Sequence, residues 1–398
     1  MAHWDQISYF GTSNGRLPHR TFGIRQSDRL FHLYTIGRTG AGKSTLLESL
    51  ALQDIRSGRG LAVIDPHGDL AERLVHQVPE SRRGDLIYLN VADTSQPYGY
   101  NPLRRIRADK IPLAASGILE AFKKLWGDSW GVRMEHVLRN ALYALLEYGD
   151  ATLPDVLRLL TDKTFRATVL KHLHNTQVEL FWREEFPKYN PRYQQEAIAP
   201  IQNKIGALLA DPRLYRIFTA PPIDLHVRQI MDQGKILIVN LSKGQLGEDT
   251  ANLLGAMLVT TFSLAAFSRA EIPEAERKDF FLYLDEFQNF TTLSVANMVS
   301  ELRKFKVGLI LAHQHLHQLE PDVRHAVLAN VGTLVAFRLG PEDATLFARE
   351  FAPKFSPEDL VNLPYHDVFI KLMIDGVPSR PFSATALHPT QLVKLAGK

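Results

Sequence analysis

Short apolar runs without polar alternation recur along the chain, and helix-like segments such as Ala251–Arg269 and Leu293–Phe305 lie between them. Strands that are buried on both faces of a parallel sheet have this continuous apolar character. The strand-like runs are Leu61–Asp65, Leu86–Val91, Ile236–Leu241, Phe280–Asp285, Gly308–Ala312 and Thr333–Phe337. The alternation of such runs with helices predicts an α/β fold with a mainly parallel central sheet.

The stretch from about Arg105 to Leu225 has helical apolar spacing, many prolines and no convincing strand. We therefore expect an all-helical domain, residues 105–225, inserted between a first sheet part, residues 1–104, and a second, residues 226–398. The alternative is a set of ordinary helices that cover the sheet, but about 120 helical residues exceed one crossover connection. The helical segments expected in this stretch are Met134–Tyr148, Leu153–Leu160, Phe165–His174 and Tyr193–Ala210.

Both ends of the chain predict antiparallel strands. The segment Val368–Leu387 alternates like a strand around Asp375-Gly376, which is a hairpin signal. We expect residues 1–30 to add an antiparallel edge to the sheet. The second sheet part therefore ends in a C-terminal hairpin.

A phosphate-binding motif follows the apolar run Phe31–Ile36 and precedes the helix-like Thr45–Ile55. The sequence Gly37-Arg38-Thr39-Gly40-Ala41-Gly42-Lys43-Ser44 fits the P-loop pattern, in which backbone N–H groups surround phosphate oxygens and the lysine reaches the β- and γ-phosphates. The helix N-terminus adds partial positive charge. The alternative is a plain glycine-rich turn before a helix. The predicted nucleotide-binding residues are Gly37, Thr39, Gly40, Ala41, Gly42, Lys43, Ser44 and Thr45.

A second motif, Phe280-Phe281-Leu282-Tyr283-Leu284-Asp285-Glu286, is a buried strand that ends in two carboxylates. We expect Mg²⁺, brought by the nucleotide, to be held by Ser44 and Asp285, while Glu286 polarises the attacking water. The alternative is that both acids merely face solvent. Together the two motifs predict an ATPase that uses ATP and Mg²⁺.

Composition changes this picture little. A net charge of +3, from 46 basic and 43 acidic residues, means that any grip on an anionic polymer comes from local patches. The absence of cysteine excludes disulfides, thiolate zinc sites and a cysteine nucleophile. No signal peptide and no uninterrupted apolar run near 18 residues is apparent, so we expect a soluble cytoplasmic protein without an intrinsic membrane span.

The motifs together resemble the HerA–FtsK superfamily of hexameric P-loop pumps and, within it, the conjugative coupling proteins of type IV secretion. The resemblance rests on Ile36–Thr45, Ile64-Asp65-Pro66-His67-Gly68-Asp69, Tyr100-Asn101-Pro102-Leu103, Tyr283-Leu284-Asp285-Glu286-Phe287 and Leu311-Ala312-His313-Gln314. It implies a RecA-like fold, a homo-hexamer, DNA as the substrate, and a relaxase or type IV secretion channel components as partners at the inner membrane. Coupling proteins usually carry an N-terminal membrane segment, whereas this chain begins almost at the P-loop strand.

The resemblance assigns two further catalytic roles. Gln314 ends the strand that we expect between the P-loop strand and the Asp-Glu strand, where a neutral amide can sense the γ-phosphate or the water. Arg303 is the implied arginine finger toward a neighbouring subunit's nucleotide, with Arg338 as the second choice. The alternatives are a capping or solvent-facing Gln314 and plain surface arginines.

The other polar candidates are weaker. Asp65, His67 and Asp69 lie after the second strand, either near the nucleotide or as a simple turn. His313, His315 and His317 lack a carboxylate or cysteine to complete a zinc site. The candidate DNA contacts are Lys243, Lys123, Lys124, Trp126 and the run Arg303-Lys304-Phe305-Lys306, and no base-reading motif accompanies them.

The sequence therefore predicts a hexameric, ATP-driven DNA translocase for conjugative transfer that binds DNA without sequence preference. One alternative is a HerA-like translocase for DNA-end processing. Another is a secretion-system ATPase that acts on protein substrates, and a non-catalytic nucleotide-gated scaffold is the least favoured.

Overall fold

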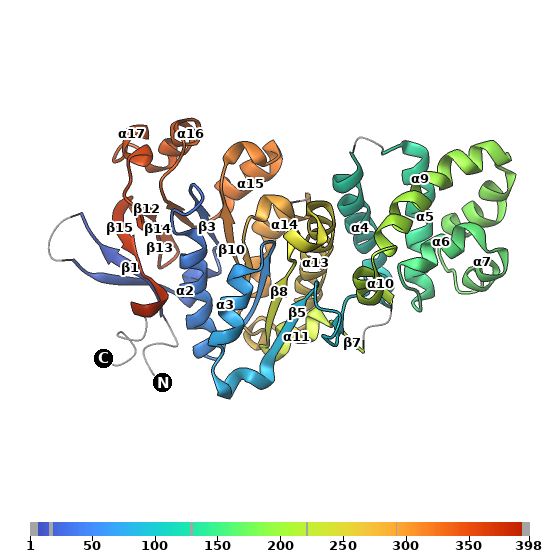
Figure 1. Ribbon diagram of the computed structural model, residues 1–398, viewed down its shortest axis with the longest axis horizontal. Helices are drawn as coiled ribbons and strands as arrows, with labels where there is room; N and C mark the ends of the chain where they lie inside the picture. The colour runs from blue at the N-terminus through green and yellow to red at the C-terminus, as the bar shows by residue number, and fades with distance from the viewer. Residues whose placement is uncertain (1–6, 16–18, 128–129, 220–221, 292, 392–398) are drawn as a thin grey trace. The chain divides into compact units, whose positions relative to one another are not determined.

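A computed structural model describes residues 7–15, 19–127, 130–219, 222–291 and 293–391 of the chain (Figure 1). The chain forms two compact units. Unit 1 comprises Met1–Tyr88, Val227–Ser242 and Ala265–Lys398, and unit 2 comprises Leu89–His226 and Lys243–Leu264. The domain boundaries that we expect near residues 105 and 225 remain predictions.

An 11-stranded sheet organises unit 1, in the order β2-β1-β15-β12-β11-β3-β10-β9-β4-β8-β5. The neighbours from β11 to β8 run parallel, which confirms the predicted α/β fold with a mainly parallel sheet. The strands in sheet order are β2 (Thr21–Arg25), β1 (Ile7–Ser13), β15 (Phe382–Ala386), β12 (Asp367–Lys371), β11 (Thr333–Ala336), β3 (Leu33–Ile36), β10 (Val307–His313), β9 (Phe280–Leu284), β4 (Gly60–Asp65), β8 (Ile236–Asn240) and β5 (Leu86–Asn90). The predicted strands are confirmed to within two residues at each end.

The register aligns the carboxyl ends of the central strands. His313 of β10 lies opposite Ile36 of β3, and Leu284 of β9 lies opposite both Leu311 and Ile64. The segments that leave these strands therefore meet at one edge of the sheet, here called the carboxyl edge. The opposite end of the parallel strands is called the amino edge.

The antiparallel side of the sheet agrees with the expectation from the chain ends. β1 pairs with β2 and with β15, β15 pairs with β12, and β12 pairs with β11, all antiparallel. β13 (Met373–Ile374) and β14 (Val377–Pro378) form a short hairpin across the predicted turn Asp375-Gly376. The predicted edge strands and C-terminal hairpin are therefore confirmed.

Helices cover the sheet because their apolar faces have no other place to be buried. In α2 (Lys43–Arg56), Leu47, Leu50 and Ile55 are fully buried in the core, each contributing about 1.5–3 kcal/mol relative to exposure. The other helices in unit 1 that bear on the site are α1 (Gln26–Arg29), α3 (Asp69–Gln77), α14 (Leu293–Glu301), the 3₁₀ turn η10 (Leu302–Phe305), α15 (Pro321–Asn330), α16 (Pro341–Phe351) and α17 (Pro357–Val361).

Unit 2 is mainly helical. Its helices include α4 (Ile111–Trp126), α5 (Val132–Tyr148), α6 (Pro154–Thr161), α7 (Lys163–Leu170), α8 (Thr176–Leu180), α9 (Pro191–Leu209), α10 (Pro212–Thr219) and α12 (Lys243–Leu246). α7 ends earlier than the predicted Phe165–His174, because the side chain of Asn175 accepts from Gln177 and Val178 N–H groups and so begins α8. The apolar spacing also missed the two-residue strand β7 (Ile223–Asp224), which pairs with β6 (Tyr98–Gly99).

One long apolar helical stretch occurs among the described residues. Glu248–Glu271, which contains α13 (Glu248–Ser268), is long and apolar enough to cross a membrane. However, 72% of its most apolar window is buried inside the protein, as in the core helix of a soluble protein.

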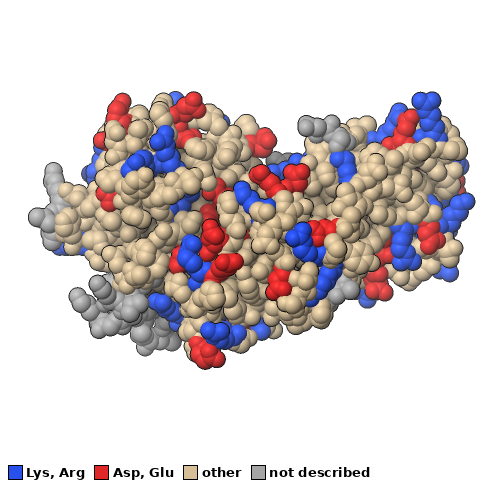
Figure 2. Space-filling model, viewed as in Figure 1, with Lys and Arg blue, Asp and Glu red and all other residues tan. Residues whose placement is uncertain are grey.

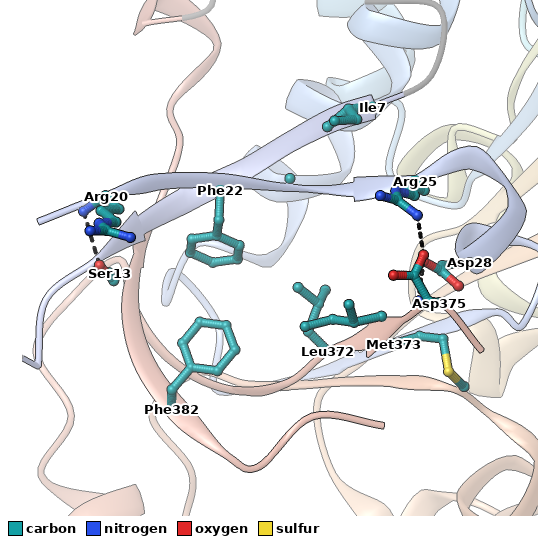
Figure 3. A pocket seen from close by; sticks show the side chains of 12 residues that line it. Ile7, Ser13, Arg20, Phe22, Arg25, Asp28, Leu372, Met373, Asp375 and Phe382 are labelled. Carbon is teal, nitrogen blue, oxygen red and sulfur yellow. Dashed lines mark hydrogen bonds and ion pairs between the residues drawn. The ribbon is translucent and has the colours of Figure 1, made fainter. Parts of the chain in front are cut away.

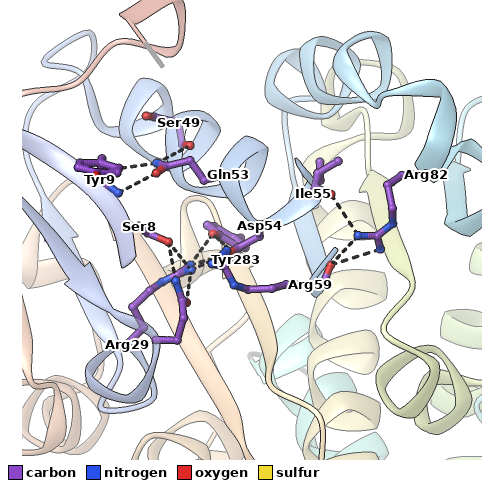
Figure 4. Close-up of polar contacts among 11 residues, drawn as sticks. Ser8, Tyr9, Arg29, Ser49, Gln53, Asp54, Ile55, Arg59, Arg82 and Tyr283 are labelled. Atoms are coloured by element: carbon purple, nitrogen blue, oxygen red, sulfur yellow. Dashed lines mark hydrogen bonds and ion pairs between the residues drawn. The ribbon is translucent and has the colours of Figure 1, made fainter. Parts of the chain in front are cut away.

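A buried ionic network connects α1, α2 and β9 toward the amino edge (Figure 4). Arg29 donates to Asp54 Oδ2 at 2.8 Å and to the Tyr283 hydroxyl at 2.7 Å, and it also donates to Ser8 and Gln26. Burial by itself would lower the pKa of Arg29, but the charges of Asp54 and Tyr283 and the hydrogen bonds to both together outweigh burial and raise the pKa above its ordinary value. The two charged groups of this network, Arg29 and Asp54, are therefore paired with each other.

Candidate nucleotide-binding site

The predicted P-loop forms a tight turn at the carboxyl edge, between β3 and α2. Gly40 and Gly42 have φ of 76° and 121°, which residues with a Cβ rarely adopt. A Cβ on Gly42 would also lie 2.9 Å from the Phe337 ring. The Gly37 N–H donates to the His313 carbonyl at 3.3 Å, so the loop is attached to β10. The loop is thus held in the conformation in which N–H groups can surround phosphate oxygens.

Lys43 lies inside this turn and is 5% exposed. Its Nζ donates to the carbonyl oxygens of Gly37 at 2.7 Å and Arg38 at 3.2 Å. Burial lowers the pKa of Lys43, while the charges of Glu286 and Asp285 oppose that change. The structure therefore brings the lysine and the two carboxylates of the second motif together, although they are far apart in the sequence.

Carboxylates gather where β4 and β9 end. The Ser44 hydroxyl donates to Asp285 Oδ2 at 2.9 Å. Burial, followed by the charges of Asp65 and Glu286, raises the pKa of Asp285 to about 6. A site that concentrates negative charge beside a hydroxyl oxygen suits a hard divalent cation, which prefers oxygen ligands. Ser44 and Asp285, the two residues predicted to hold Mg²⁺, therefore lie together here.

Glu286 is buried and has a left-handed backbone, with φ of 47°. Such a conformation in a residue other than glycine costs of order 1–3 kcal/mol and is concentrated at functional sites. Gln314 Nε2 donates to Glu286 Oε1, and Gln288 Nε2 donates to Oε2 at 2.8 Å. Thr39 Oγ1 donates to Gln314 Oε1 at 2.9 Å. A chain of hydrogen bonds therefore connects the P-loop to two of the predicted catalytic residues, Gln314 and Glu286, with β10 between β3 and β9 as expected.

Arg303 lies apart from this cluster. It precedes β10 in η10, at the amino edge, and its guanidinium stacks over the Phe31 ring with 3.5 Å between the guanidinium carbon and the ring centroid. The exposed Arg303 therefore does not reach the P-loop of its own chain. Arg338 follows β11 at the carboxyl edge, where its backbone carbonyl accepts from Arg38 N–H at 2.9 Å.

Asp65 has a local structural role. Its carboxylate accepts from the N–H groups of His67 at 2.9 Å and Ala71 at 3.0 Å, which fixes the start of α3. His67 and Asp69 are exposed.

The three neighbouring histidines have separate partners. His313 lies in strand β10, beside the Tyr34 hydroxyl at 2.9 Å. His315 contacts Asp343 at 3.0 Å, and His317 lies 3.8 Å from Glu342.

A family model for the DNA-binding domain of the type IV secretion-system coupling protein matches residues 20–352. This chain belongs to that family. No curated protein sequence matches the chain at a significant level. Among solved structures, the chain is similar to the bacterial conjugative coupling protein TrwBdeltaN70 in its unbound form, with 18% identity, a TM-score of 0.67, and 92% of this chain and 87% of that chain covered.

Two further solved structures extend the comparison. The plasmid coupling protein TrwB in complex with ADP and Mg²⁺ is 18% identical, with a TM-score of 0.64 and the same coverage of 92% and 87%. VirB4 of Thermoanaerobacter pseudethanolicus is 15% identical, with a TM-score of 0.66, and the match covers 96% of this chain and 97% of that one. These likenesses confirm the RecA-like fold that the motifs implied.

Two residues at this site, Asp343 and His366, are not indicated by any motif in the sequence. Asp343 at the start of α16 is buried, and it accepts from Leu316 N–H at 3.0 Å and contacts His315. It thereby fixes the segment just after Gln314. His366 lies against the P-loop turn, which only the fold reveals, because the loop that carries it comes from the far end of the chain.

The candidate DNA contacts lie on different elements of the chain. Lys243 begins α12, directly after β8. In unit 2, Trp126 stacks on Phe122 with 4.4 Å between ring centroids, and the Lys204 Nζ lies 5.0 Å from the Trp126 ring centroid. On the face that Figure 2 shows, basic and acidic side chains are intermixed, and no broad single-sign surface is visible there.

A groove of about 300 Å³ lies away from the P-loop (Figure 3). Phe22, Leu372 and Phe382 line it, and the Arg25–Asp375 ion pair closes one side. It follows the end of β12, which is antiparallel to β11, so the groove belongs to the amino edge. This groove is therefore separate from the predicted nucleotide site.

Proposed function

We propose that the chain is an ATP-driven DNA translocase that works as a homo-hexamer in conjugative, type IV secretion DNA transfer. The observation that carries this proposal is the hydrogen-bonded chain Thr39–Gln314–Glu286 beside the Ser44–Asp285 pair. A P-loop that only bound nucleotide would not need a buried, left-handed glutamate aimed at the phosphate side of the loop. Hydrolysis is therefore part of the proposed function.

Each residue of the site has a proposed role. The backbone of Gly37–Ser44 and the Lys43 ammonium bind the phosphates, with Thr45 extending the helix N-terminus behind them. Ser44 and Asp285 hold Mg²⁺, which when bound neutralises charge on the phosphate oxygens. The solved TrwB complexes with ADP and Mg²⁺ and with the ATP analogue ADPNP support both ligands.

Glu286 accepts a proton from the attacking water, and Gln314 keeps the Glu286 carboxylate oriented while its amide reports on the γ-phosphate. Because Arg303 lies at the amino edge of its own sheet, its proposed role as an arginine finger requires a neighbouring subunit. Arg338 is the second choice, since its Nε is already bonded to the Leu363 carbonyl at 2.7 Å. Supply of a finger from a neighbour would make hydrolysis depend on ring assembly.

DNA is bound through its backbone in this proposal, without sequence preference. Lys243, Lys123, Lys124 and the aromatic Trp126 are the candidate contacts, by charge and by stacking. The proposed partners are a relaxase or components of the secretion channel. The proposed location is the cytoplasm, with attachment to the inner membrane through those partners.

A secretion-system ATPase that acts on protein substrates is the second candidate function. The chain shares its fold with VirB4 as well as with TrwB, so the fold does not decide between the two functions. The family match over residues 20–352 favours the DNA-transfer reading. A HerA-like role in DNA-end processing stays the other alternative.

The test compares ATP hydrolysis without DNA, with single-stranded DNA and with double-stranded DNA, from about 50 to 200 mM salt. We expect DNA to stimulate hydrolysis, with an effect that fades steeply as salt rises and does not depend on sequence. The matched control is Glu286→Gln, which should bind the same DNA without hydrolysis. An ATPase that is indifferent to both DNA forms would contradict DNA translocation, and rings absent from electron micrographs taken with DNA and a non-hydrolysable ATP analogue would contradict the hexamer.

A further inference from the structure

The loop from Leu363 to His366, which leads into β12, is fastened against the P-loop. The His366 N–H donates to the Ala41 carbonyl at 3.3 Å, and the His366 carbonyl accepts from Ala386 N–H at 2.9 Å. Arg338 Nε donates to the Leu363 carbonyl at 2.7 Å. Three hydrogen bonds to three different segments thus place this loop beside the residues that precede Lys43.

His366 is held in a conformation that it would not choose alone. Its φ is 68°, and its Nδ1 would lie 3.3 Å from a Cβ on Gly42. Backbone strain of this kind, of order 1–3 kcal/mol, persists only where surrounding contacts impose it, and it is concentrated at ligand sites. The strain is located at the residue that directly follows an exposed aromatic ring.

That ring belongs to Tyr365, which is 63% exposed. The Arg338 guanidinium carbon lies 4.3 Å from its ring centroid, so a cation supports the ring while most of its surface faces solvent. A large aromatic side chain presented to solvent on an anchored loop suits recognition of another planar group. No shift of the loop is required to expose it.

The P-loop holds only the phosphates of a nucleotide, so the base must be received by groups next to the loop. The catalytic cluster of Asp285, Glu286 and Gln314 comes from β9 and β10, on one side of β3. The Tyr365 loop follows α17 and leads into β12. In the sheet, β12 and β11 lie on the other side of β3. The loop is therefore on the side away from the γ-phosphate chemistry.

We propose that Tyr365, supported by Arg338, stacks on the base of the nucleoside triphosphate whose phosphates the P-loop binds. This inference rests on the proposed function. Stacking on an aromatic face uses no base-specific hydrogen bond, so the site accepts a guanine base about as well as an adenine base. Tyr365 is a binding residue here, and takes no part in the hydrolytic step.

The experiment measures equilibrium binding to the full chain by calorimetry, for ATP, GTP and inorganic triphosphate, each with Mg²⁺. Tyr365→Ala should weaken ATP and GTP about 5- to 30-fold, corresponding to loss of one base–aromatic stack, and leave triphosphate affinity unchanged. Tyr365→Phe should keep the wild-type affinities, because only the ring is needed. Tyr215→Ala, at an exposed tyrosine in unit 2, is the matched control and should change none of them.

A second readout reports stacking directly. Fluorescence of 2-aminopurine riboside triphosphate should be quenched on binding to the wild type and to Tyr365→Phe, and should stay bright on Tyr365→Ala at saturating protein. Unchanged ATP affinity and unchanged quenching in Tyr365→Ala would overturn the base-stacking site. Equal losses for ATP and inorganic triphosphate would also overturn it, because they would show damage to the P-loop itself.

The result for wild type separates this inference from the proposed function. If wild type binds neither ATP nor triphosphate, the nucleotide site itself is refuted, and the stacking proposal falls with it. If wild type binds both ligands with equal affinity, the phosphate site stands and Tyr365 is no base platform. If Tyr365→Ala changes only ring assembly, the tyrosine is a subunit contact and the base-stacking proposal is wrong.

Discussion

Buried charges are paired at the amino edge of the sheet, whereas negative charges are concentrated at the carboxyl edge, although α2 and β9 contribute residues to both edges. At the amino edge, Asp54 of α2 and Tyr283 of β9 surround Arg29, and the Arg29 guanidinium is paired with the Asp54 carboxylate (Figure 4). At the carboxyl edge, Lys43 begins the same helix and Asp285 follows the same strand, but burial, followed by the like charges of Asp65 and Glu286, raises the pKa of Asp285 to about 6.

This difference separates residues that stabilise the fold from residues that are kept for chemistry. A buried ion pair contributes little to stability compared with apolar residues of similar volume. Removal of one partner is nevertheless strongly destabilising, because the other charge stays buried without a partner. An excess of like charge lowers stability until a ligand of opposite charge arrives. Removal of a carboxylate should therefore lower the free energy of unfolding at the amino edge and raise it at the carboxyl edge.

The largest effect is expected at the amino edge. Asp54→Ala leaves the Arg29 guanidinium buried without its counter-ion, so we expect the free energy of unfolding to fall by about 3–5 kcal/mol. Urea unfolding followed by circular dichroism measures this loss. The matched control is Asp85→Ala, which removes an acid paired to Arg82 at a half-exposed site and should cost less than about 1 kcal/mol. If the two variants lose equal stability, the network does not hold the fold as described.

A smaller effect of opposite sign is expected at the carboxyl edge. Because the folded-state pKa of Asp285 is raised above its unfolded value of 3.8, the ionised carboxylate is disfavoured in the fold at pH 7. Asp285→Asn should therefore raise the free energy of unfolding by about 1 kcal/mol at pH 7 in a chelating buffer.

This gain should shrink as the pH falls from about 6 toward 3.8, since the wild-type carboxyl then takes up a proton in the folded protein while it is still ionised in the unfolded chain. Repeating the urea titration across that range tests the sign. A variant that is less stable than wild type at pH 7 would show that the Ser44–Asp285 hydrogen bond outweighs the repulsion, and the comparison of the two edges would fail.

Sequence reasoning found the parts of the site that use local motifs. The P-loop and the Asp-Glu strand each carry their residues in one short segment, so spacing alone placed Lys43, Ser44, Asp285 and Glu286. The central strands were equally readable, because burial on both faces makes them continuously apolar. These features depend on neighbours in the sequence.

The parts that were missed depend on long-range contacts. Nothing in the sequence around His366 or Asp343 shows that they lie beside the P-loop and behind Gln314. Likewise, Arg303 looks like part of a helix near the nucleotide motifs, yet the direction of β10 puts it at the amino edge. Pairing of distant segments decides these positions, and local pattern does not encode it.

The central claim is that the carboxyl edge hydrolyses ATP through Glu286, and one variant tests it most directly. Glu286→Gln keeps the shape and the hydrogen bond from Gln288, but cannot accept the proton of the attacking water. ATP affinity, hydrolysis rate and urea unfolding should be measured on one preparation, beside wild type. We expect near-normal ATP affinity, unfolding at no lower urea concentration, and hydrolysis slower by at least about a hundredfold. Hydrolysis at the wild-type rate, with binding and folding intact, would contradict the account.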